Sequence, residues 1–311
     1  MARRKKAFSG NVNDIDLRLM RVFKTVIECG GLSAAQTELG VGRSTISRQI
    51  SDLEIRFGMR LCHRGRSGFY LTQQGQQAYD FINHFLKQTE DFSSQIASIA
   101  KKMVGKIEIG MIDFTLSDAR NSLIPTIREF QEVAPDVSIN MMTGSPNEVE
   151  RGVIDGKLHI GIVPDYQRHP SLNYMTLYDE DVGLFCGGNH PLVEDAKNGV
   201  ALLEEDICKH KLVHRSYFES ERLRQRKQKF PVGSTVYQTE AVLALVRSGV
   251  YLGFFPKHCQ TLIRDEFYEL LPQAFSYSTP ICAVWRSDRN KSLILQDFLN
   301  LLQLKKLRSQ G

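Results

Sequence analysis

The segment from Ser33 to Glu54 constrains the fold more than any other part of this 311-residue chain. It has the pattern of two short helices joined at Gly40, a residue type that adopts left-handed backbone at a helix end without steric cost. Ile46, Ile50 and Leu53 recur at spacings of four and three, which predicts one buried stripe on the second helix. We interpret the segment as a helix-turn-helix, a motif that places its second helix in the DNA major groove. An ordinary pair of packed helices with a solvated polar face is the alternative.

Polar and basic side chains of the second helix lie off this apolar stripe. Arginine reads guanine edges or holds phosphates, and hydroxyl groups bond to either target. Ser33 is expected to cap the first helix through its hydroxyl. A basic, glycine-bearing tip at 63–68 fits a β-hairpin wing that touches the DNA backbone or minor groove. The candidate DNA-binding residues are Ser33, Arg43, Ser44, Thr45, Ser47, Arg48, Arg64 and Arg66.

Charge marks the same end of the chain. Residues 1–70 hold 13 lysines and arginines against 6 acidic residues, whereas the remainder holds 27 against 29. Cations therefore concentrate where the motif predicts phosphate contact. Residues 1–12, with the run from Arg3 to Lys6, are predicted to form a basic disordered tail that adds salt-dependent affinity. No apolar run follows this tail and none reaches about 18 residues, so we expect a cytoplasmic protein with no secretory signal and no membrane span.

The stretch from Asp16 to Thr72 resembles the N-terminal winged helix-turn-helix of LysR-type transcriptional regulators. The resemblance is carried by DLRLMRVFKTVIECGGLSAAQTELGV, STISRQISDLEIRFGMRLCHR and LTQQG. Relatives usually open the second helix with Ser-Gln-Pro, where this chain has Gly42, Arg43 and Ser44. Proline pre-sets a first helical turn, and arginine changes base preference or phosphate contact. The resemblance implies a sequence-specific transcription regulator with a DNA-binding domain at 13–72, but no operator sequence can be taken over from relatives.

A long helix is predicted at about 72–103. Its apolar positions repeat every seven residues in two series, Ala78, Phe85, Phe92, Ile99 and Ile82, Thr89, Ile96, Met103. Such a repeat favours pairing with a second chain, and a single helix packed on its own domain is the alternative. In LysR-type regulators this is the linker helix, which implies dimerisation through residues 73–104. A dimer presents two reading helices to a pseudo-palindromic site.

The remaining residues, 105–311, alternate predicted strands and helices, which is typical of α/β sheets. KIEIG, APDVSI, IDGKLHIGIV and SGVYLGFFP resemble the effector-binding region of the same family. The resemblance implies a periplasmic-binding-protein-like fold with lobe one at 105–164 and 283–304 and lobe two at 165–282. The chain is therefore predicted to be multidomain: a winged helix-turn-helix rich in α structure, a linker helix, and a two-lobed α/β effector domain.

Effector candidates are expected at the cleft between these lobes, because small-molecule sites form where strand ends meet helix N-termini. Each candidate has a simpler interpretation as a helix cap or a surface group. An acid at Asp113 suggests a cationic or amine-bearing effector in place of a plain carboxylate. The candidates are Asp113, Thr115, Ser117 and Ser145 from lobe one and His214, Gln238, Thr239 and Phe254 from lobe two.

The other residue types indicate neither catalysis nor a metal site. The six cysteines contain no CxxC pair and are expected to be reduced, with redox sensing disfavoured. His210 and His214 have a metal-binding spacing without further ligands. Recognised nucleotide-binding, hydrolase and metalloprotease motifs are absent from the sequence. We expect no enzyme, no catalytic residue and no cofactor. The expected partners are operator DNA, an effector of unknown identity, a second copy in a homodimer or homotetramer, and RNA polymerase. A solute-binding protein and an enzyme using the cleft are the alternative functions.

Overall fold

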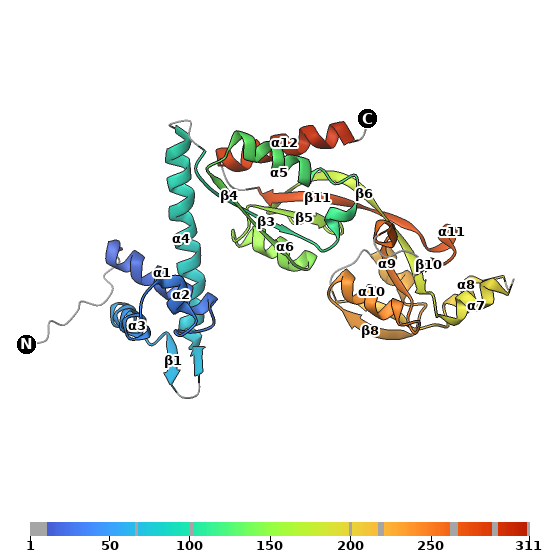
Figure 1. Cartoon of the computed structure of the whole chain (residues 1–311), viewed down its shortest axis with the longest axis horizontal. Coiled ribbons are helices and arrows are strands. Elements are labelled where there is room, and N and C mark those ends of the chain that lie inside the picture. The colour runs from blue at the N-terminus through green and yellow to red at the C-terminus, as the bar shows by residue number, and fades with distance from the viewer. Residues whose placement is uncertain are drawn as a thin grey trace, which may run out of the picture. The chain divides into compact units, whose positions relative to one another are not determined.

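A computed structural model describes residues 11–65, 68–99, 103–198, 201–216, 221–261, 267–287 and 292–309. The chain divides into two compact units, Met1–Ser93 and Ser94–Gly311. The predicted tail at 1–12 lies almost wholly outside the described residues. Figure 1 shows the helices of the first unit and the large sheet of the second.

The first unit begins with three helices, α1 (Asp14–Glu28), α2 (Ala35–Leu39) and α3 (Arg43–Phe57). Asn13 and Asp16 form a reciprocal capping box at the start of α1. Gly40 ends α2 with a left-handed φ of 62°, as its position in the turn predicts. The predicted hydroxyl cap of α2 is wrong. Its N-cap is Ala34, and the Ser33 carbonyl accepts the Gln36 amide instead.

The apolar stripe on α3 closes the core of this unit. Ile46, Ile50 and Leu53 are fully buried against Phe23 and Val26 of α1. The spacing of four and three therefore gives the buried face that it predicts. Because α3 commits this face to the core, its opposite face is left for other contacts.

A hairpin and the start of a long helix complete the unit. Strands β1 (Cys62–Gly65) and β2 (Gly68–Leu71) pair antiparallel, and α4 (Gln73–Ile99) follows them. The Thr72 hydroxyl accepts the Gly75 amide at 2.9 Å and donates to the Arg60 carbonyl at 2.7 Å, so one side chain joins the helix start to the hairpin. A Cβ at Gly75 would stand 1.8 Å from the Leu61 carbonyl oxygen, so any larger residue would push helix and hairpin apart.

The heptad positions of α4 divide between two environments. Ile82 is buried in the core of the first unit, with Ala78 and Phe85 packed partly against it. Further along the helix, Phe92 and Ile96 are 63% and 51% exposed. The early repeats therefore serve the chain's own domain, whereas the later ones carry apolar side chains on the surface.

The second unit is built on one mixed sheet. Among the described residues, seven strands pair in the order β10-β6-β11-β5-β3-β4, with β9 also paired to β6. Their bounds are β3 (Gly105–Met111), β4 (Val137–Thr143), β5 (Ile160–Pro164), β6 (Leu172–Gly187), β9 (Gly253–Pro256), β10 (Phe267–Glu269) and β11 (Tyr277–Arg286). Strand β3 runs parallel to β4 and β5, whereas β11 is antiparallel to β5 and β6. The predicted alternation of strands and helices in this region is confirmed.

Helices cover both faces of the first-lobe part of this sheet (Figure 1). Helices α5 (Leu123–Val133) and α12 (Leu293–Ser309) share one core, in which Phe130 and Phe298 pack edge to face. Helix α6 (Pro146–Ile154) packs Val149 and Val153 into the core of the other face. Two separate apolar layers therefore hold the sheet between helices.

The two lobes are joined by one long strand pair. β6 and β11 pair antiparallel from Leu172 opposite Arg286 to Val182 opposite Tyr277, with one register shift between Ile281 and Cys282. Leu177 and Tyr178 of β6 still pack in the first-lobe core, whereas Leu184 packs in a second-lobe core. We therefore draw the crossing along 178–182 and 277–281, which extends the first lobe beyond the sequence-based limits at 164/165 and 282/283 on both strands. β6 continues from one lobe into the other, so no turn in this strand marks the boundary.

In the second lobe, short helices and strands surround the C-terminal part of β6. Strands β7 (Leu212–Arg215) and β8 (Val232–Val236) pair in parallel, and its helices are α7 (Pro191–Lys197), α8 (Glu204–Ile207), α9 (Glu221–Lys227), α10 (Thr239–Arg247) and α11 (Pro272–Phe275). Two 3-10 turns lie beside the lobe junction, η1 (Thr115–Ser117) and η2 (Lys257–Thr261). None of the helices in the described ranges is long and apolar enough to span a membrane.

Candidate DNA-binding and effector-binding sites

Helix α3 presents a polar face and an open N-terminus. Arg43, Ser44, Thr45 and Arg48 are exposed, and Ser47 is half-buried. Gly42, which has no side chain to cap the helix, precedes Arg43, and the first turn contains no acidic residue. The Arg43 amide donates to Gln36 Oε1 at 3.1 Å. The other amides of the first turn and the positive end of the helix dipole favour an anion such as a phosphate at this end. Five of the predicted DNA-binding residues thus lie on one helix face or at its border.

The remaining predicted DNA-binding residues lie elsewhere. Ser33 is exposed on the turn before α2. Arg66 lies outside the described residues. Arg64, on β1, turns back to α3, where its guanidinium pairs with Glu54 and donates to the Ser47 carbonyl at 2.8 Å. The basic character of the hairpin tip predicted a DNA contact for Arg64, but its side chain is 19% exposed and committed within the domain.

Asp113 bridges the two lobes of the second unit. It follows β3 in the first lobe, and its carboxylate reaches the start of α10 in the second. One oxygen accepts the Thr239 hydroxyl at 3.0 Å, and the other accepts the backbone amides of Thr239 and Glu240. A carboxylate at a helix N-terminus is stabilised by the free amides and the dipole. Asp113 and Thr239, both predicted to bind effector, are therefore partners of each other.

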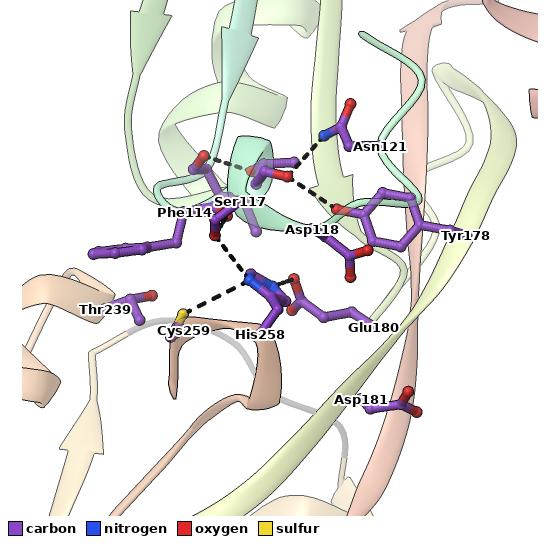
Figure 2. Close-up of polar contacts among 12 residues, drawn as sticks. Phe114, Ser117, Asp118, Asn121, Tyr178, Glu180, Asp181, Thr239, His258 and Cys259 are labelled. Atoms are coloured by element: carbon purple, nitrogen blue, oxygen red, sulfur yellow. Dashed lines mark hydrogen bonds and ion pairs between the residues drawn. The ribbon is translucent and has the colours of Figure 1, made fainter. Parts of the chain in front are cut away.

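A second contact between the lobes runs through Ser117, His258 and Glu180 (Figure 2). The Ser117 hydroxyl lies 2.8 Å from His258 Nδ1, and His258 Nε2 lies 3.1 Å from Glu180 Oε1. The Ser117 hydroxyl also donates to the Phe114 carbonyl at 2.7 Å. The serine of a hydrolytic triad directs its proton to the imidazole, whereas the Ser117 hydroxyl directs its proton to a backbone carbonyl. This row of residues therefore lacks the arrangement of a hydrolytic triad.

Buried polar groups brace the loop that carries these contacts. The Thr115 hydroxyl donates to the Ile112 carbonyl at 2.6 Å, and Asn121 donates to the Thr115 carbonyl at 2.8 Å. Thr115 is 1% exposed, so the prediction that its hydroxyl faces a cleft is wrong. Burial also raises the pKa of Tyr178, whose hydroxyl lies 3.5 Å from the same Thr115 carbonyl. The loop is thereby held from within the first lobe.

Asp118 and Arg120 form an ion pair beside this loop, at 2.7 Å. Burial alone would raise the pKa of Asp118, but the hydrogen bonds and charge of Arg120 outweigh it and lower that pKa. The guanidinium also stands over the Tyr178 ring and approaches Asp181 at 3.4 Å. Arg120, Glu180 and His258 could not be predicted from the sequence, because their segments carry no motif and meet only in the folded chain.

The other effector candidates serve local structure or lie apart. Ser145 caps α6 and exchanges hydrogen bonds with Glu148 in a capping box. Phe254 is 3% exposed inside the second-lobe core, so its predicted place in a cleft is wrong. Gln238 is exposed directly before α10, and His214 lies half-buried on β7. Of the eight candidates, the structure brings Asp113, Ser117 and Thr239 to the junction of the lobes.

No cluster of three histidine, cysteine or acidic side chains suited to a metal ion occurs within the described ranges. The His210 ring packs against the His190 ring at 4.7 Å between centroids. Burial raises the pKa of Cys62 to about 11 and those of Cys186 and Cys259 to about 12, so these thiols are unreactive near neutral pH.

Family models match both units of the chain. The LysR substrate binding domain matches residues 102–305, and the bacterial regulatory helix-turn-helix protein of the lysR family matches residues 17–76. The chain belongs to the LysR family. It is a DNA-binding transcriptional regulator with an effector-binding domain, and it is neither an enzyme nor a plain solute-binding protein.

Named relatives support this membership of the LysR family along the full length. The chain is 34% identical over 301 residues to the HTH-type transcriptional activator BauR of Pseudomonas aeruginosa, a match that covers 96% of this chain and 98% of that protein. It is 23% identical to the probable HTH-type transcriptional regulator LrrA of Synechococcus elongatus, over 86% and 87% of the two chains.

Solved LysR-family structures share the fold. CbnR, crystallised in complex with its target DNA, aligns with a TM-score of 0.66 at 20% identity and covers 93% of this chain and 99% of its own. A full-length OxyR variant from Pseudomonas aeruginosa aligns with a TM-score of 0.58 at 17% identity, over 95% of each chain. At these identities the likeness establishes the arrangement of the elements.

Proposed function

We propose that this regulator reads operator DNA through the exposed face of α3 and is gated by a small molecule bound where its two lobes meet. The DNA-reading part of the proposal covers residues 13–72, with Arg43, Ser44, Thr45, Ser47 and Arg48 on the helix face. The exposed N-terminus of α3 and its neighbouring arginines support this assignment. Arg66 and the tail at 1–12 remain candidates for phosphate contact.

The gating part rests on the bridge from Asp113 to the start of α10. We propose that Asp113–Thr239 and Ser117–His258, together called the junction contacts, hold the lobes closed when no effector is bound. Both contacts start from one loop after β3, and Glu180 on the connecting strand anchors His258. A ligand entering here must break or rearrange these contacts, so its binding energy shifts the balance between two lobe arrangements.

The junction contacts also change the expected chemistry of the effector. The hypothesis of an amine-bearing effector required a carboxylate at Asp113 that faces the ligand, whereas this carboxylate already meets the amides of α10. Asp113 therefore supplies the anion at this helix start from within the chain.

We propose that two chains pair through residues 73–104. The exposed Phe92 and Ile96 continue the heptad pattern beyond the domain core and support this pairing. Paired chains would place two α3 helices on a pseudo-palindromic site, and pairs of dimers would form a homotetramer. We also propose that the regulator acts in the cytoplasm and contacts RNA polymerase there.

A gel shift with the DNA upstream of the protein's own gene tests the proposed function. We expect saturable, sequence-dependent binding that Arg48→Ala weakens at least about tenfold. A thermal-shift screen of metabolites on the full chain then identifies effectors by a raised unfolding temperature. Binding that is independent of sequence in the first assay would contradict the regulator proposal for this DNA-reading face.

A further inference from the structure

Glu54 and Arg64 connect the hairpin to α3 by a set of charged hydrogen bonds. One carboxylate oxygen of Glu54 accepts the backbone amides of Leu61 at 2.9 Å and Cys62 at 3.2 Å. The other pairs with the guanidinium of Arg64. Glu54 lies in the last turns of α3, so its side chain fixes both the entry to β1 and a residue within that strand.

Arg64 extends this connection to the middle of α3. Its Nη1 atom donates to the Ser47 carbonyl at 2.8 Å and lies 3.4 Å from the Ser47 hydroxyl. Ser47 precedes the exposed Arg48, so the guanidinium ends directly beneath the proposed DNA-reading face. The side chains of Arg64 and Glu54 are only 19% and 14% exposed.

This geometry gives Arg64 a different task from that of an arginine that holds a phosphate. A phosphate-binding arginine directs its donors outward, whereas Arg64 directs them to a carbonyl and a carboxylate of its own domain. A planar guanidinium can meet two acceptors at fixed angles, which also fixes the orientation of the strand that carries it. The pair therefore sets the position of the wing relative to α3.

We propose that Glu54 and Arg64 are positioning residues for DNA recognition. They hold the β1–β2 wing at the angle at which wing and α3 contact the same operator, without touching the DNA. This inference rests on the proposed reading of DNA by α3 and adds a role that charge at the wing does not predict. Loss of either Glu54 or Arg64 is expected to weaken operator binding, because the wing then no longer keeps its position relative to α3.

Glu54→Gln tests this inference, because electrostatics and positioning predict opposite changes in operator affinity. The substitution removes a negative charge from a DNA-binding domain, so electrostatics alone would strengthen binding to the polyanion. The positioning role predicts the opposite, about tenfold weaker operator binding, because the charged bond to Arg64 is lost. Glu38→Gln is the matched control, since Glu38 is an exposed acid on α2 of the same domain. It removes the same charge and is expected to bind at least as tightly as the unmodified protein.

Arg64→Lys gives a second test that preserves charge. A lysine still holds a phosphate, so a phosphate-contact role predicts nearly unchanged affinity and an unchanged salt dependence. Positioning predicts weaker binding, because an ammonium group cannot meet both the Ser47 carbonyl and the Glu54 carboxylate in the geometry of the guanidinium. Arg64→Ala should also weaken binding without lowering the slope of log K against log salt, whereas loss of a phosphate contact lowers that slope by about one.

The experiment measures operator affinity of the full chain at several salt concentrations by fluorescence anisotropy, with thermal unfolding of each variant as a check of folding. Weaker binding by Glu54→Gln than by Glu38→Gln, together with an unchanged salt slope for Arg64→Ala, supports the inference. Equal or tighter binding by Glu54→Gln, or near-normal binding by Arg64→Lys, overturns it. Sequence-independent binding by the unmodified protein would overturn the proposed function itself, and with it any role in positioning.

Discussion

The carboxylate of Asp113 caps the helix that begins at Thr239, although the two residues lie 126 positions apart in the chain. A helix start usually takes its cap from the residue just before it. Here the cap comes from the other lobe, so the amides of Thr239 and Glu240 gain this carboxylate acceptor only while the lobes are together. This relationship couples local helix stability to lobe closure.

Asp113→Asn is expected to loosen the junction as a whole. The amide that replaces one carboxylate oxygen cannot accept the α10 amides, and the charge at the helix start is lost. We expect about tenfold faster hydrogen exchange in 239–243 and also in 257–260, which Ser117 contacts from the same loop. Hydrogen exchange of the full chain, read by mass spectrometry, measures both segments.

Glu148→Gln is the control for that variant, because Glu148 accepts the Ser145 amide at the start of α6 within a single lobe. It should leave both segments unchanged. Faster exchange confined to 239–243 in Asp113→Asn would mean that Asp113 is a local cap, and the junction contacts would then not act together.

Asp16→Asn is expected to destabilise the first unit strongly. Asp16 is fully buried on α1 and pairs with Arg56 on α3, which is itself largely buried. Removing one partner leaves the other charge uncompensated, at a cost of about 3–5 kcal/mol. Glu28→Gln breaks an exposed pair with Lys24 and should cost less than about 0.5 kcal/mol. Urea unfolding followed by far-ultraviolet circular dichroism compares the two, and equal small losses would contradict the expectation.

His190 should make the second lobe sensitive to acid. Burial, and then the neighbouring His210, lowers the pKa of His190 from 6.5 to about 4. Between pH 6.5 and pH 4 the imidazole of His190 is protonated in the unfolded chain and neutral in the folded chain. The stability contributed by neutral His190 is therefore complete above pH 6.5 and is lost as pH falls towards 4. The loss is at most about 3 kcal/mol.

Calorimetry at pH 7 and pH 5 measures this loss in the full chain. His190→Asn keeps an acceptor for the Leu192 amide and should flatten the pH dependence. His169→Asn is the matched control, because exposed His169 accepts the Ser171 amide in the same way. An unflattened dependence in His190→Asn would assign the acid sensitivity to other groups.

Thiol reactivity should separate the cysteines into two groups. Cys29 and Cys208 are half-buried, whereas Cys62, Cys186, Cys259 and Cys282 are buried. Burial raises the pKa of Cys208 and of the four buried thiols. We expect at most two of the six thiols to react quickly with a disulfide reagent at pH 7.5, and all six after unfolding in urea. Rapid reaction of a third thiol in the folded protein would reopen the hypothesis of redox sensing.

Local patterns predicted the elements, because each depends on neighbouring residues. The spacing of Ile46, Ile50 and Leu53 and the glycine at 40 defined α3 and its turn. At the start of α6, Ser145 and Glu148 form a capping box of the same local kind, with Pro146 in the first turn. In these places the residue types and their spacing are sufficient, since the contacts that stabilise the structure lie within one helix or one turn.

The candidate sites depended on distant partners that no spacing reveals. Arg64 stands in a basic run, which predicted a DNA contact, but its orientation is set by Glu54 on another element. Asp113 was interpreted as a ligand for the effector because its partner at α10 was not visible in the sequence. His258 and Glu180 were not predicted as site residues, since neither lies in a motif and their contact forms only when β6 and η2 come together.

The register of the two connecting strands makes the second lobe a removable insertion. Val182 on β6 lies directly opposite Tyr277 on β11, so the inserted lobe leaves and re-enters at adjacent points of the sheet. A two-residue turn joining these positions would close β6 and β11 into a hairpin that keeps the pairs on the first-lobe side. One lobe of the effector-binding domain could therefore be exchanged for another by two cuts, with the first lobe and the DNA-reading unit left in place.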